Sequence, residues 1–396
     1  MTRSRSLIVV LLVCAPIAVC AVFASGLWLG GHPDKLPGPL RDAFVEEDRS
    51  LRAEIEDSIE DNYFKKVDAD KLTDDSLKGI VRSLDDRFST YITPKEAKEF
   101  QESITGKFDG VGMTIEEDKR GLRVLQVFDK TPAKRAGIHK GDLIVAVNGR
   151  SIAGVDSQVA TARIKGEPGT SVKLSVVSPP GKKKRTFDVE RARIEVPVAE
   201  GRIVERGGEK IAVVKLLSFS AGAHGLLRQE IDQLLKQGAQ GIVLDLRGNG
   251  GGLLREGVLV ASLFVEDGKI VSTKGRTKPE RVFEAEGKAI PEDIPMVVLV
   301  DRGSASASEI VTGALRDSGR ATVVGTRTFG KGVFQEVEPL SNGGVLELTV
   351  GQYFLPKGDN ISDKGIQPAV KARDKPKTPR DEALPTAIDK LLEKAR

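Results

Sequence analysis

The sequence predicts a multidomain α/β + β fold, with a helical N-terminal segment, a small β-rich unit and an α/β core. At 396 residues, the chain exceeds what one hydrophobic core normally organises, so we expect two to four domains. Its apolar pattern changes from helical spacing, through short alternating stretches, to strands that alternate with helices. Hydrophobic residues make up 39% and charged residues 30%, which is typical of a globular body.

Residues 1–31 form the predicted signal peptide or membrane anchor. Two arginines precede an almost wholly apolar stretch, 7–31, which has small residues around Ala24 and is long enough to span a bilayer. Cleavage after Ala24 and retention as a transmembrane anchor remain alternatives, and both place the body outside the cytoplasm. The chain's two cysteines, Cys14 and Cys20, lie in this stretch, so the body offers no disulfide and no thiolate nucleophile.

The charge balance does not indicate a nucleic-acid partner, since 61 basic and 57 acidic residues leave a net charge of +4. A basic run at 182–185 is interpreted as an exposed hairpin turn, with a polyanion-binding patch as the alternative. With three histidines and no HExxH spacing, the sequence disfavours a zinc enzyme. We expect no metal and no cofactor.

The first segment after the leader, 36–105, has apolar residues at helical spacing among many charges. Such a narrow apolar stripe usually needs a partner helix to cover it. We interpret the segment as a helical dimerisation region, and an intramolecular cap is the alternative. Its stripe includes Phe44, Leu51, Ile55 and Ile59, and continues through 68–85.

The next two segments differ in period. Residues 106–193 alternate in short strands at 122–128, 142–147, 171–177 and 185–190, with helices at 132–136 and 157–165. Residues 194–371 are expected to form an α/β core, followed by a C-terminal linker and helix at 372–396. The core strands are predicted at 210–216, 241–246, 296–300, 321–324 and 345–355.

A candidate nucleophile lies in the segment 300–309, which joins a buried strand to a helix. Small residues there let backbone amides approach a carbonyl, and the helix N-terminus favours an oxyanion. Ser304, Ser306 and Ser308 could equally be turn and N-cap residues. The segment lacks the Gly-x-Ser-x-Gly elbow of α/β-hydrolases.

A candidate base follows at Lys331, in the glycine-rich segment 328–335. Burial disfavours an ammonium and can lower the pKa of such an amine, which makes it able to accept a serine proton. Gln335 lies four residues on and could orient it. The alternative is a surface lysine in a turn. Neither His139 nor His224 has a catalytic context, so a Ser-His-Asp triad is disfavoured.

These motifs together resemble the carboxyl-terminal processing peptidases, or tail-specific proteases, over about residues 40–371. Residues 83–91 resemble the signature that precedes the PDZ domain, and 364–368 resemble the closing motif. Asp245-Leu-Arg-Gly-Asn249 resembles the glycine loop. The chain departs from many relatives in having Asn249-Gly-Gly-Gly252 in place of Asn-Pro-Gly-Gly.

The resemblance implies an N-terminal helical segment, a PDZ domain and a crotonase/ClpP-like α/β serine protease core. It assigns Ser306 as the nucleophile, Lys331 as the general base and Gln335 as the residue that positions the lysine. The oxyanion hole would be formed by the amide of Ala307 and by that of Gly251 or Gly252. The peptide carboxylate would be bound by Gly110, Val111, Gly112 and Met113.

The implied function is a serine-type endopeptidase with a Ser-Lys dyad that recognises free, apolar C-terminal tails through its PDZ domain. Its substrates would be exported or envelope proteins, and it would work in the periplasm or on the extracytoplasmic face of the membrane, as a homodimer. One alternative is a non-catalytic PDZ adaptor. Another is a chymotrypsin-like protease with a PDZ domain, but that type carries the PDZ domain after the catalytic domain.

Overall fold

The computed structural model describes residues 47–179, 183–374 and 380–395. The predicted leader, 1–31, and both cysteines lie outside these ranges. Within them, no helix combines the length and the apolar character needed to cross a membrane. The chain divides into two compact units, Met1–Tyr91 and Ile92–Arg396, and each is described by itself.

In the described part of the first unit, the helices are α3 (Glu47–Asn62) and α4 (Ala69–Arg82). The side chain of Asp68 caps α4 by accepting a hydrogen bond from the amide of Lys71. Apolar side chains of the predicted stripe are more than half exposed, namely Leu51 (55%), Ile55 (51%) and Ile80 (57%). Within the described part of this unit, these side chains therefore lack a covering surface.

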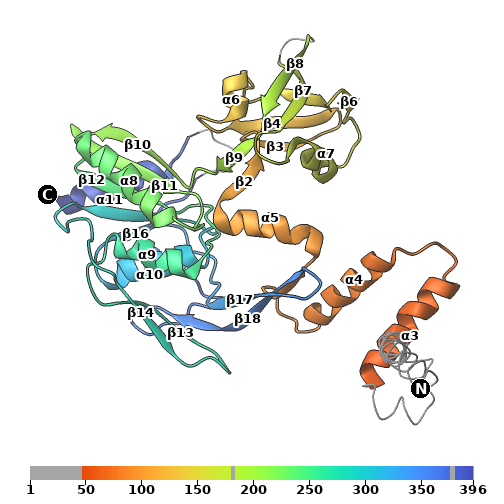
Figure 1. The fold of residues 1–396 in the computed structure, drawn as a ribbon. Helices are drawn as coiled ribbons and strands as arrows, with labels where there is room; N and C mark the ends of the chain where they lie inside the picture. The colour runs from red at the N-terminus through yellow and green to blue at the C-terminus, as the bar shows by residue number, and fades with distance from the viewer. Residues whose placement is uncertain (1–46, 180–182, 375–379, 396) are drawn as a thin grey trace, which may run out of the picture. The chain divides into compact units, whose positions relative to one another are not determined.

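The second unit begins with α5 (Pro94–Thr105) and a β-rich unit drawn in yellow to light green in Figure 1. Its main sheet has the order β3-β4-β5-β7-β8, with β6 paired to β5, so β3 lies at an edge. One side of the sheet is covered by α6 and α7 around a core that includes Ile144, Leu174 and Val176. The elements are β2 (Lys107–Gly110), β3 (Met113–Asp118), β4 (Gly121–Val127), α6 (Pro132–Ala136), β5 (Leu143–Val147), β6 (Arg150–Ser151), α7 (Ser157–Ile164), β7 (Ser171–Val177), β8 (Lys184–Glu190) and β9 (Ala192–Glu195).

A two-stranded ladder, β2 with β9, lies where the chain enters and leaves this β-rich unit. Beside it, the ammonium of Lys165, which follows α7, pairs with Glu102 of α5 at 2.5 Å. The same ammonium lies over the ring of Phe108, 5.6 Å from its centroid. These contacts tie the end of α7 to the helix that precedes the β-rich unit.

The α/β core is built on a sheet of order β10-β11-β12-β15-β16-β19, which is parallel from β11 onward. Its parallel strands are apolar on both faces, as expected for a sheet covered by helices on each side. The strands are β10 (Ala199–Arg206), β11 (Glu209–Leu216), β12 (Gly241–Asp245), β15 (Met296–Val300), β16 (Thr322–Gly325) and β19 (Val370–Lys371).

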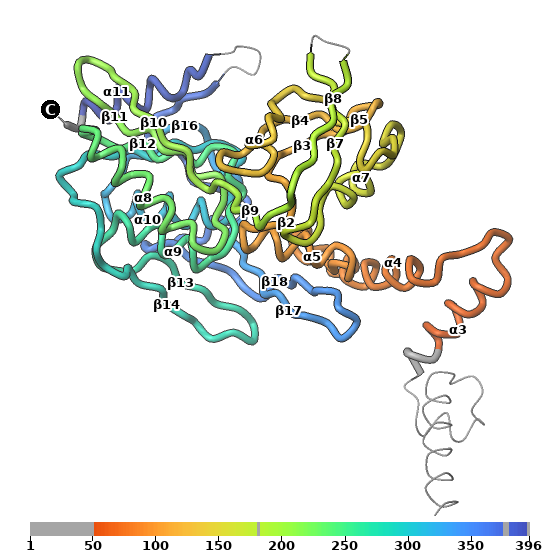
Figure 2. The backbone as a smooth tube through the Cα atoms, turned by 45° about the horizontal axis from the view of Figure 1, so that its top comes forward, coloured from red at the N-terminus to blue at the C-terminus, as the bar shows by residue number. Residues whose placement is uncertain are grey.

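Helices cover both faces of this sheet, because successive strand residues point to opposite sides. One face packs against α8 (Ala223–Lys236), α9 (Leu254–Ser262) and α10 (Ala307–Asp317). The other face packs against α11 (Ala383–Ala395), which buries Leu384, Ile388 and Leu391. Figure 2 shows α11 on the side of the sheet opposite α8, α9 and α10.

A second sheet of the core is antiparallel: β18 pairs with β17 and with β13, and β13 pairs with β14. It contributes Ile270, Val271 and Tyr353 to the core under α9 and α10. The strands are β13 (Lys269–Lys274), β14 (Arg281–Glu284), β17 (Val333–Pro339) and β18 (Val345–Phe354).

The predicted fold class is confirmed: an N-terminal helical segment, a β-rich unit and an α/β core follow one another along the chain. In the α/β core the prediction missed β10, β13, β14, β17 and β19, and in the β-rich unit it missed β2, β3, β6 and β9. Three of these, β10, β14 and β17, have mostly exposed or half-buried side chains, so they lack the apolar runs that marked the parallel strands.

Candidate active site

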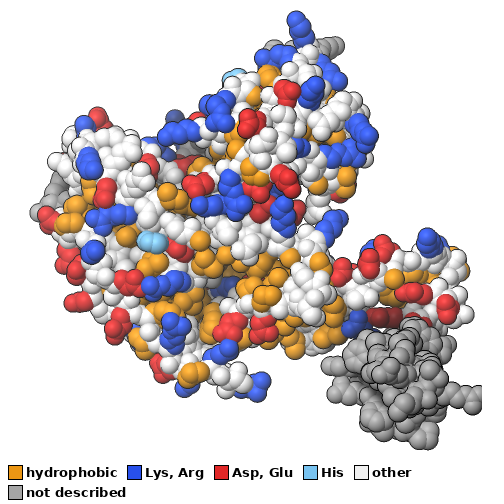
Figure 3. Space-filling model, in the orientation of Figure 1, with side chains coloured by type: hydrophobic (Ala, Val, Ile, Leu, Met, Phe, Trp, Pro, Cys, Tyr) orange, Lys and Arg blue, Asp and Glu red, His pale blue; other side chains and the backbone are white. Residues whose placement is uncertain are grey.

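A cavity of about 400 Å³ brings together the loops that follow β12, β15 and β16. Ser306, Lys331, Gln335, Gly251 and Gly252 all line it. The rest of its wall is largely apolar and includes Phe100, Ile104, Phe219, Leu253, Leu254, Ile310, Val333, Phe334 and Val337. In Figure 3, apolar side chains gather over the area between α5, α9 and β17.

Ser306 lies directly before α10, with φ 56° and ψ −117°. Its amide donates to Oε2 of Glu309 at 3.0 Å. The neighbouring loop approaches closely at Gly251, where a Cβ would lie 2.8 Å from Cβ of Ser306 and 3.0 Å from N of Ala307. A glycine at 251 therefore permits the contact between the two loops.

The fully buried carboxylate of Glu309 links the two loops that carry Ser306 and Lys331. Besides the Ser306 amide, it accepts from the amides of Lys331 (3.0 Å) and Gly330 (2.7 Å). It also accepts from the hydroxyl of Thr328 at 2.6 Å. We did not predict a role for Glu309, although the Ser-x-x-Glu spacing of a capping box marks it in the sequence.

Tyr353 adds a further donor to Glu309, with its hydroxyl 3.4 Å from Oε2. Burial and the charge of Glu309 raise the pKa of the Tyr353 phenol well above its usual value. The phenol therefore stays protonated and can donate throughout the neutral pH range.

The loop of Lys331 is held from the other side by the segment 360–366. The hydroxyl of Thr328 accepts from the amide of Ile366 at 2.7 Å, and the side-chain amide of Asn360 donates to the carbonyl of Gly332 at 2.8 Å. A Cβ at Gly332 would lie 2.2 Å from Oγ of Ser362. Ile366, from the segment that resembles the closing motif, and Asn360, which precedes that segment, thus help to fix the path of the lysine loop.

Two polar side chains of the β17–β18 hairpin share the cavity with Lys331. Gln335 donates from Nε2 to Oγ1 of Thr349 at 2.9 Å. Half-buried Glu347 faces Lys331: burial raises the pKa of the Glu347 carboxyl, while the charge of Lys331 opposes that shift. The sequence did not point to Glu347.

The candidate oxyanion donors differ in their surroundings. The amide of buried Ala307 makes no hydrogen bond to a described residue, as is usual in the first turn of a helix. The amide of Gly251 donates to Oδ1 of Asn249 at 2.9 Å. Gly252 lies against Phe219, where a Cβ would be 2.6 Å from the carbonyl oxygen. Of the two glycines, Gly251 is the one beside Ser306.

His224, a histidine considered for a catalytic triad, lies outside this cavity. Nδ1 of His224 is 2.8 Å from the buried carboxylate of Glu256, and neither residue lines the cavity. Across the described ranges, there is no group of three or more His, Cys, Asp or Glu side chains that could hold a metal ion.

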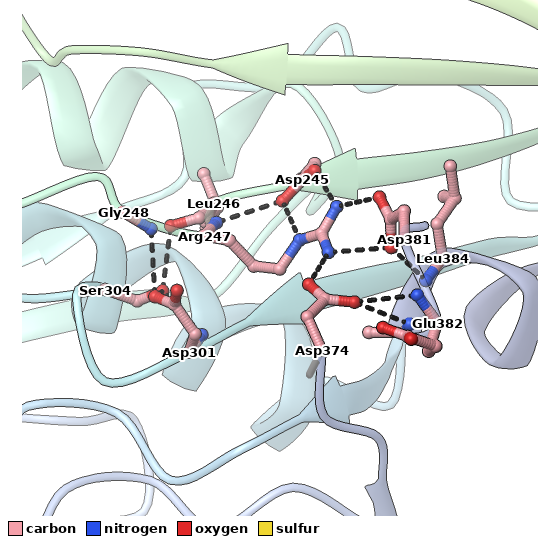
Figure 4. Close-up of polar contacts among 11 residues, drawn as sticks. Asp245, Leu246, Arg247, Gly248, Asp301, Ser304, Asp374, Asp381, Glu382 and Leu384 are labelled. Carbon is pink, nitrogen blue, oxygen red and sulfur yellow. Dashed lines mark hydrogen bonds and ion pairs between the residues drawn. The ribbon is translucent and has the colours of Figure 1, made fainter. Parts of the chain in front are cut away.

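The glycine loop is anchored at its start by Arg247, whose side chain is 15% exposed. Figure 4 shows its guanidinium between three carboxylates, those of Asp245 (2.7 Å), Asp374 (2.6 Å) and Asp381 (2.8 Å). Burial alone would lower the pKa of Arg247, but the hydrogen bonds to Asp245 and Asp381 raise it above its ordinary value. Asp374 also accepts from the amides of Glu382 and Ala383, so the loop is tied to the start of α11.

The predicted peptide-binding loop of the β-rich unit lies between β2 and β3. Gly112 has φ 87°, and a Cβ there would lie 2.3 Å from Cβ of Thr131, so the turn requires glycine. The loop opens onto the edge strand β3. On α7, Val159 is 44% exposed.

Comparisons with known proteins agree with this architecture. The profile of peptidase family S41 matches residues 210–372, and that of the PDZ domain matches residues 110–190. A solved structure of a Bacteroides fragilis protein classed with the S41 proteases covers 78% of this chain and 84% of its own, with a TM-score of 0.52 and 19% identity. At that identity, the likeness shows the fold alone.

Two curated relatives are closer in sequence. The carboxy-terminal processing protease CtpA of Bacillus subtilis is 37% identical over 80% of this chain and 67% of its own length. A Staphylococcus saprophyticus protein named as a CtpA-like serine protease is 33% identical over 91% of this chain and 71% of its own length. The chain therefore belongs to the carboxy-terminal processing serine proteases of peptidase family S41 and carries a PDZ domain.

Proposed function

We propose that the protein is an endopeptidase in which Ser306 is the nucleophile and Lys331 the general base. The observation that carries the proposal is the bridge made by Glu309. A single buried carboxylate accepts from the amides of both Ser306 and Lys331, at the wall of the cavity that both residues line. Lys331 is itself only partly exposed at this wall.

In the proposed reaction, the neutral amine of Lys331 takes the proton from Oγ of Ser306 as the oxygen attacks a peptide carbonyl. The amide of Ala307 and that of Gly251 stabilise the resulting oxyanion, and the N-terminus of α10 adds a favourable field. Gln335 helps to orient the amine. The protonated Lys331 then donates to the leaving amine, and water hydrolyses the acyl-enzyme.

The amide of Gly251 must be released from Asn249 before it can serve an oxyanion. In the structure it donates to Oδ1 of Asn249, so this half of the oxyanion hole would form only after a local rearrangement. The buried amide of Ala307 needs no such change. Gly252 remains the alternative donor.

We further propose that the PDZ domain binds a free, apolar C-terminal tail as an added strand beside β3. The position of β3 at the sheet edge supports this mode. The amides from Gly110 to Met113 would bind the terminal carboxylate, and exposed Val159 of α7 would contact the last side chain.

The setting of the enzyme is proposed from the sequence. Residues 1–31 would direct the body to the extracytoplasmic side as a signal peptide or anchor, where exported or envelope proteins are the substrates. The exposed apolar side chains of α3 and α4 support a homodimer formed through this helical region. The masses of the intact protein and of a Leu51→Asp/Ile55→Asp variant, measured by light scattering, would test that state.

The decisive experiment compares the protein with Ser306→Ala and Lys331→Ala variants on a substrate that ends in an apolar tail. We expect each variant to lose at least a thousandfold in kcat/KM, because the dyad acts as a unit. Lys357→Ala, an exposed lysine outside the cavity, is the matched control and should keep full activity. Equal turnover by all four proteins would refute the proposed dyad, and a non-catalytic adaptor would then be favoured.

A further inference from the structure

A second and larger cavity, of about 830 Å³, lies at the carboxyl edge of the parallel sheet. It shares no lining residue with the cavity of Ser306. Its wall is formed by the ends of β15, β16 and β19 and by the start of α11. The carboxyl edge of an open parallel sheet is where such folds commonly bind ligands, and the volume suits a small molecule.

The lining of this cavity is strongly basic. It contains five cationic side chains and two carboxylates, a difference of 5 − 2 = +3. The cationic residues are Arg247, Arg302, Arg327, Lys371 and Arg373. Asp245 and Asp381 pair with Arg247 from outside the lining and reduce this excess to 5 − 4 = +1. The cations other than Arg247 still repel one another unless an anion lies between them.

The two carboxylates of the lining are already engaged. Asp301 accepts from the amides of Gly248 (2.9 Å) and Gly303 (2.8 Å). Asp374 pairs with Arg247 and caps the start of α11 (Figure 4). Arg247 is paired with the carboxylates of Asp245, Asp374 and Asp381. The other four cations form no ion pair with any described residue.

The cavity also lies at the base of all three loops that meet at Ser306. Arg247 precedes Gly251 by four residues (251 − 247), Arg302 precedes Ser306 by four (306 − 302), and Arg327 precedes Lys331 by four (331 − 327). A ligand bound here would contact the first residues of each loop. The parallel strands set this arrangement, because their carboxyl ends meet at one edge.

We propose that this cavity binds a small multivalent oxyanion, such as a diphosphate. Planar guanidinium groups bind phosphate oxygens in pairs, and Arg302, Arg327 and Arg373 line this one cavity together with Lys371. A bound anion would hold the first residues of the three loops together and so change the rate of peptide cleavage. That consequence rests on the proposed function, whereas binding itself does not.

The test is calorimetric titration of the full chain with inorganic pyrophosphate at constant ionic strength. We expect saturable binding of one pyrophosphate per chain. The Lys371→Ala/Arg373→Ala variant should bind at least tenfold more weakly with an unchanged unfolding midpoint, because both side chains are exposed. A Lys183→Ala/Lys184→Ala variant removes the same charge from the β7–β8 hairpin and should bind as the unmodified protein does.

Non-saturable binding, or an equal loss in both double variants, would overturn the proposal. The Ser306→Ala variant separates this inference from the proposed peptidase activity, since it should bind pyrophosphate normally. Normal cleavage without pyrophosphate binding would refute only the anion site. Binding without any Ser306-dependent cleavage would refute only the proposed dyad.

Discussion

A buried carboxylate and a partly buried guanidinium anchor the loops around Ser306, and their hydrogen-bonding partners are of opposite kinds. Glu309 is a carboxylate whose hydrogen-bond donors are backbone amides and hydroxyls, with no cation among them. Arg247 is a cation whose partners are the three carboxylates of Asp245, Asp374 and Asp381. Glu309 therefore positions neutral backbone and hydroxyl groups, whereas Arg247 neutralises three carboxylates that would otherwise repel one another.

The difference predicts different consequences when each group is removed. Without Arg247, three carboxylates face one another with no cation, so the main loss should be in stability. Without the charge of Glu309, the donors keep their positions only loosely, so the main loss should be in the geometry of the loops at residues 306 and 331. Three measurements can test this contrast.

The largest effect on stability is expected for Arg247→Met. Removing one partner of a buried ion pair commonly costs 3–5 kcal/mol, and we expect about 3 kcal/mol here, because Asp374 and Asp381 are more than a third exposed. Denaturant unfolding measures the change. Arg228→Met, which breaks an exposed pair with Asp232, is the control and should cost less than about 1 kcal/mol. Similar losses in the two variants would contradict the anchoring role.

Glu309→Gln should lower kcat/KM at least tenfold and stability by about 2 kcal/mol. One carboxylate oxygen becomes an NH₂ group, which is a donor. If it replaces Oε2, it faces the amides of Ser306 and Lys331; if it replaces Oε1, it faces the hydroxyl of Thr328 and the amide of Gly330. Peptide cleavage and thermal unfolding are measured together. Glu256→Gln changes another buried glutamate that accepts hydrogen bonds from backbone amides, and it should lose stability while keeping activity. Full activity of Glu309→Gln would exclude the bridge as a positioning element.

The smallest effect concerns acid pH. Burial alone would raise the pKa of Asp381, but hydrogen bonds from Arg247 and the amide of Leu384 lower it below its ordinary value. A lowered native pKa stabilises the fold above the unfolded pKa, about 4, and this stabilisation is lost as pH falls through the native value. Between pH 5 and pH 3, the unfolding midpoint should therefore fall less in Asp381→Asn than in the unmodified protein. Asp389→Asn, which lies on α11 in an exposed pair with Arg206, should follow the unmodified protein.

The sequence allowed the fold class and the candidate dyad to be predicted, because both depend on local patterns. Buried strands such as β12 and β15 are continuous apolar runs, and the segments around Ser306 and Lys331 are distinctive in glycine and serine. Membership of the family is confirmed by the comparisons, whereas the roles of Ser306, Lys331 and Gln335 stay predictions.

The contacts that position the site could not be predicted in the same way. Arg247 meets Asp374 and Asp381 across 127 and 134 residues of sequence, and no local pattern specifies such pairings. Glu347 reaches the cavity only because β18 pairs with β17. Glu309 is the exception, since its spacing from Ser306 is a recognisable capping signal.

The backbone of Ser306 carries one more consequence. A positive φ with a strongly negative ψ is costly for any residue with a Cβ, by an order of 1–3 kcal/mol, whereas glycine adopts it freely. Selection for heat resistance alone would accordingly favour glycine at this position and discard the hydroxyl. A serine at this position therefore lowers the stability of the folded state relative to glycine.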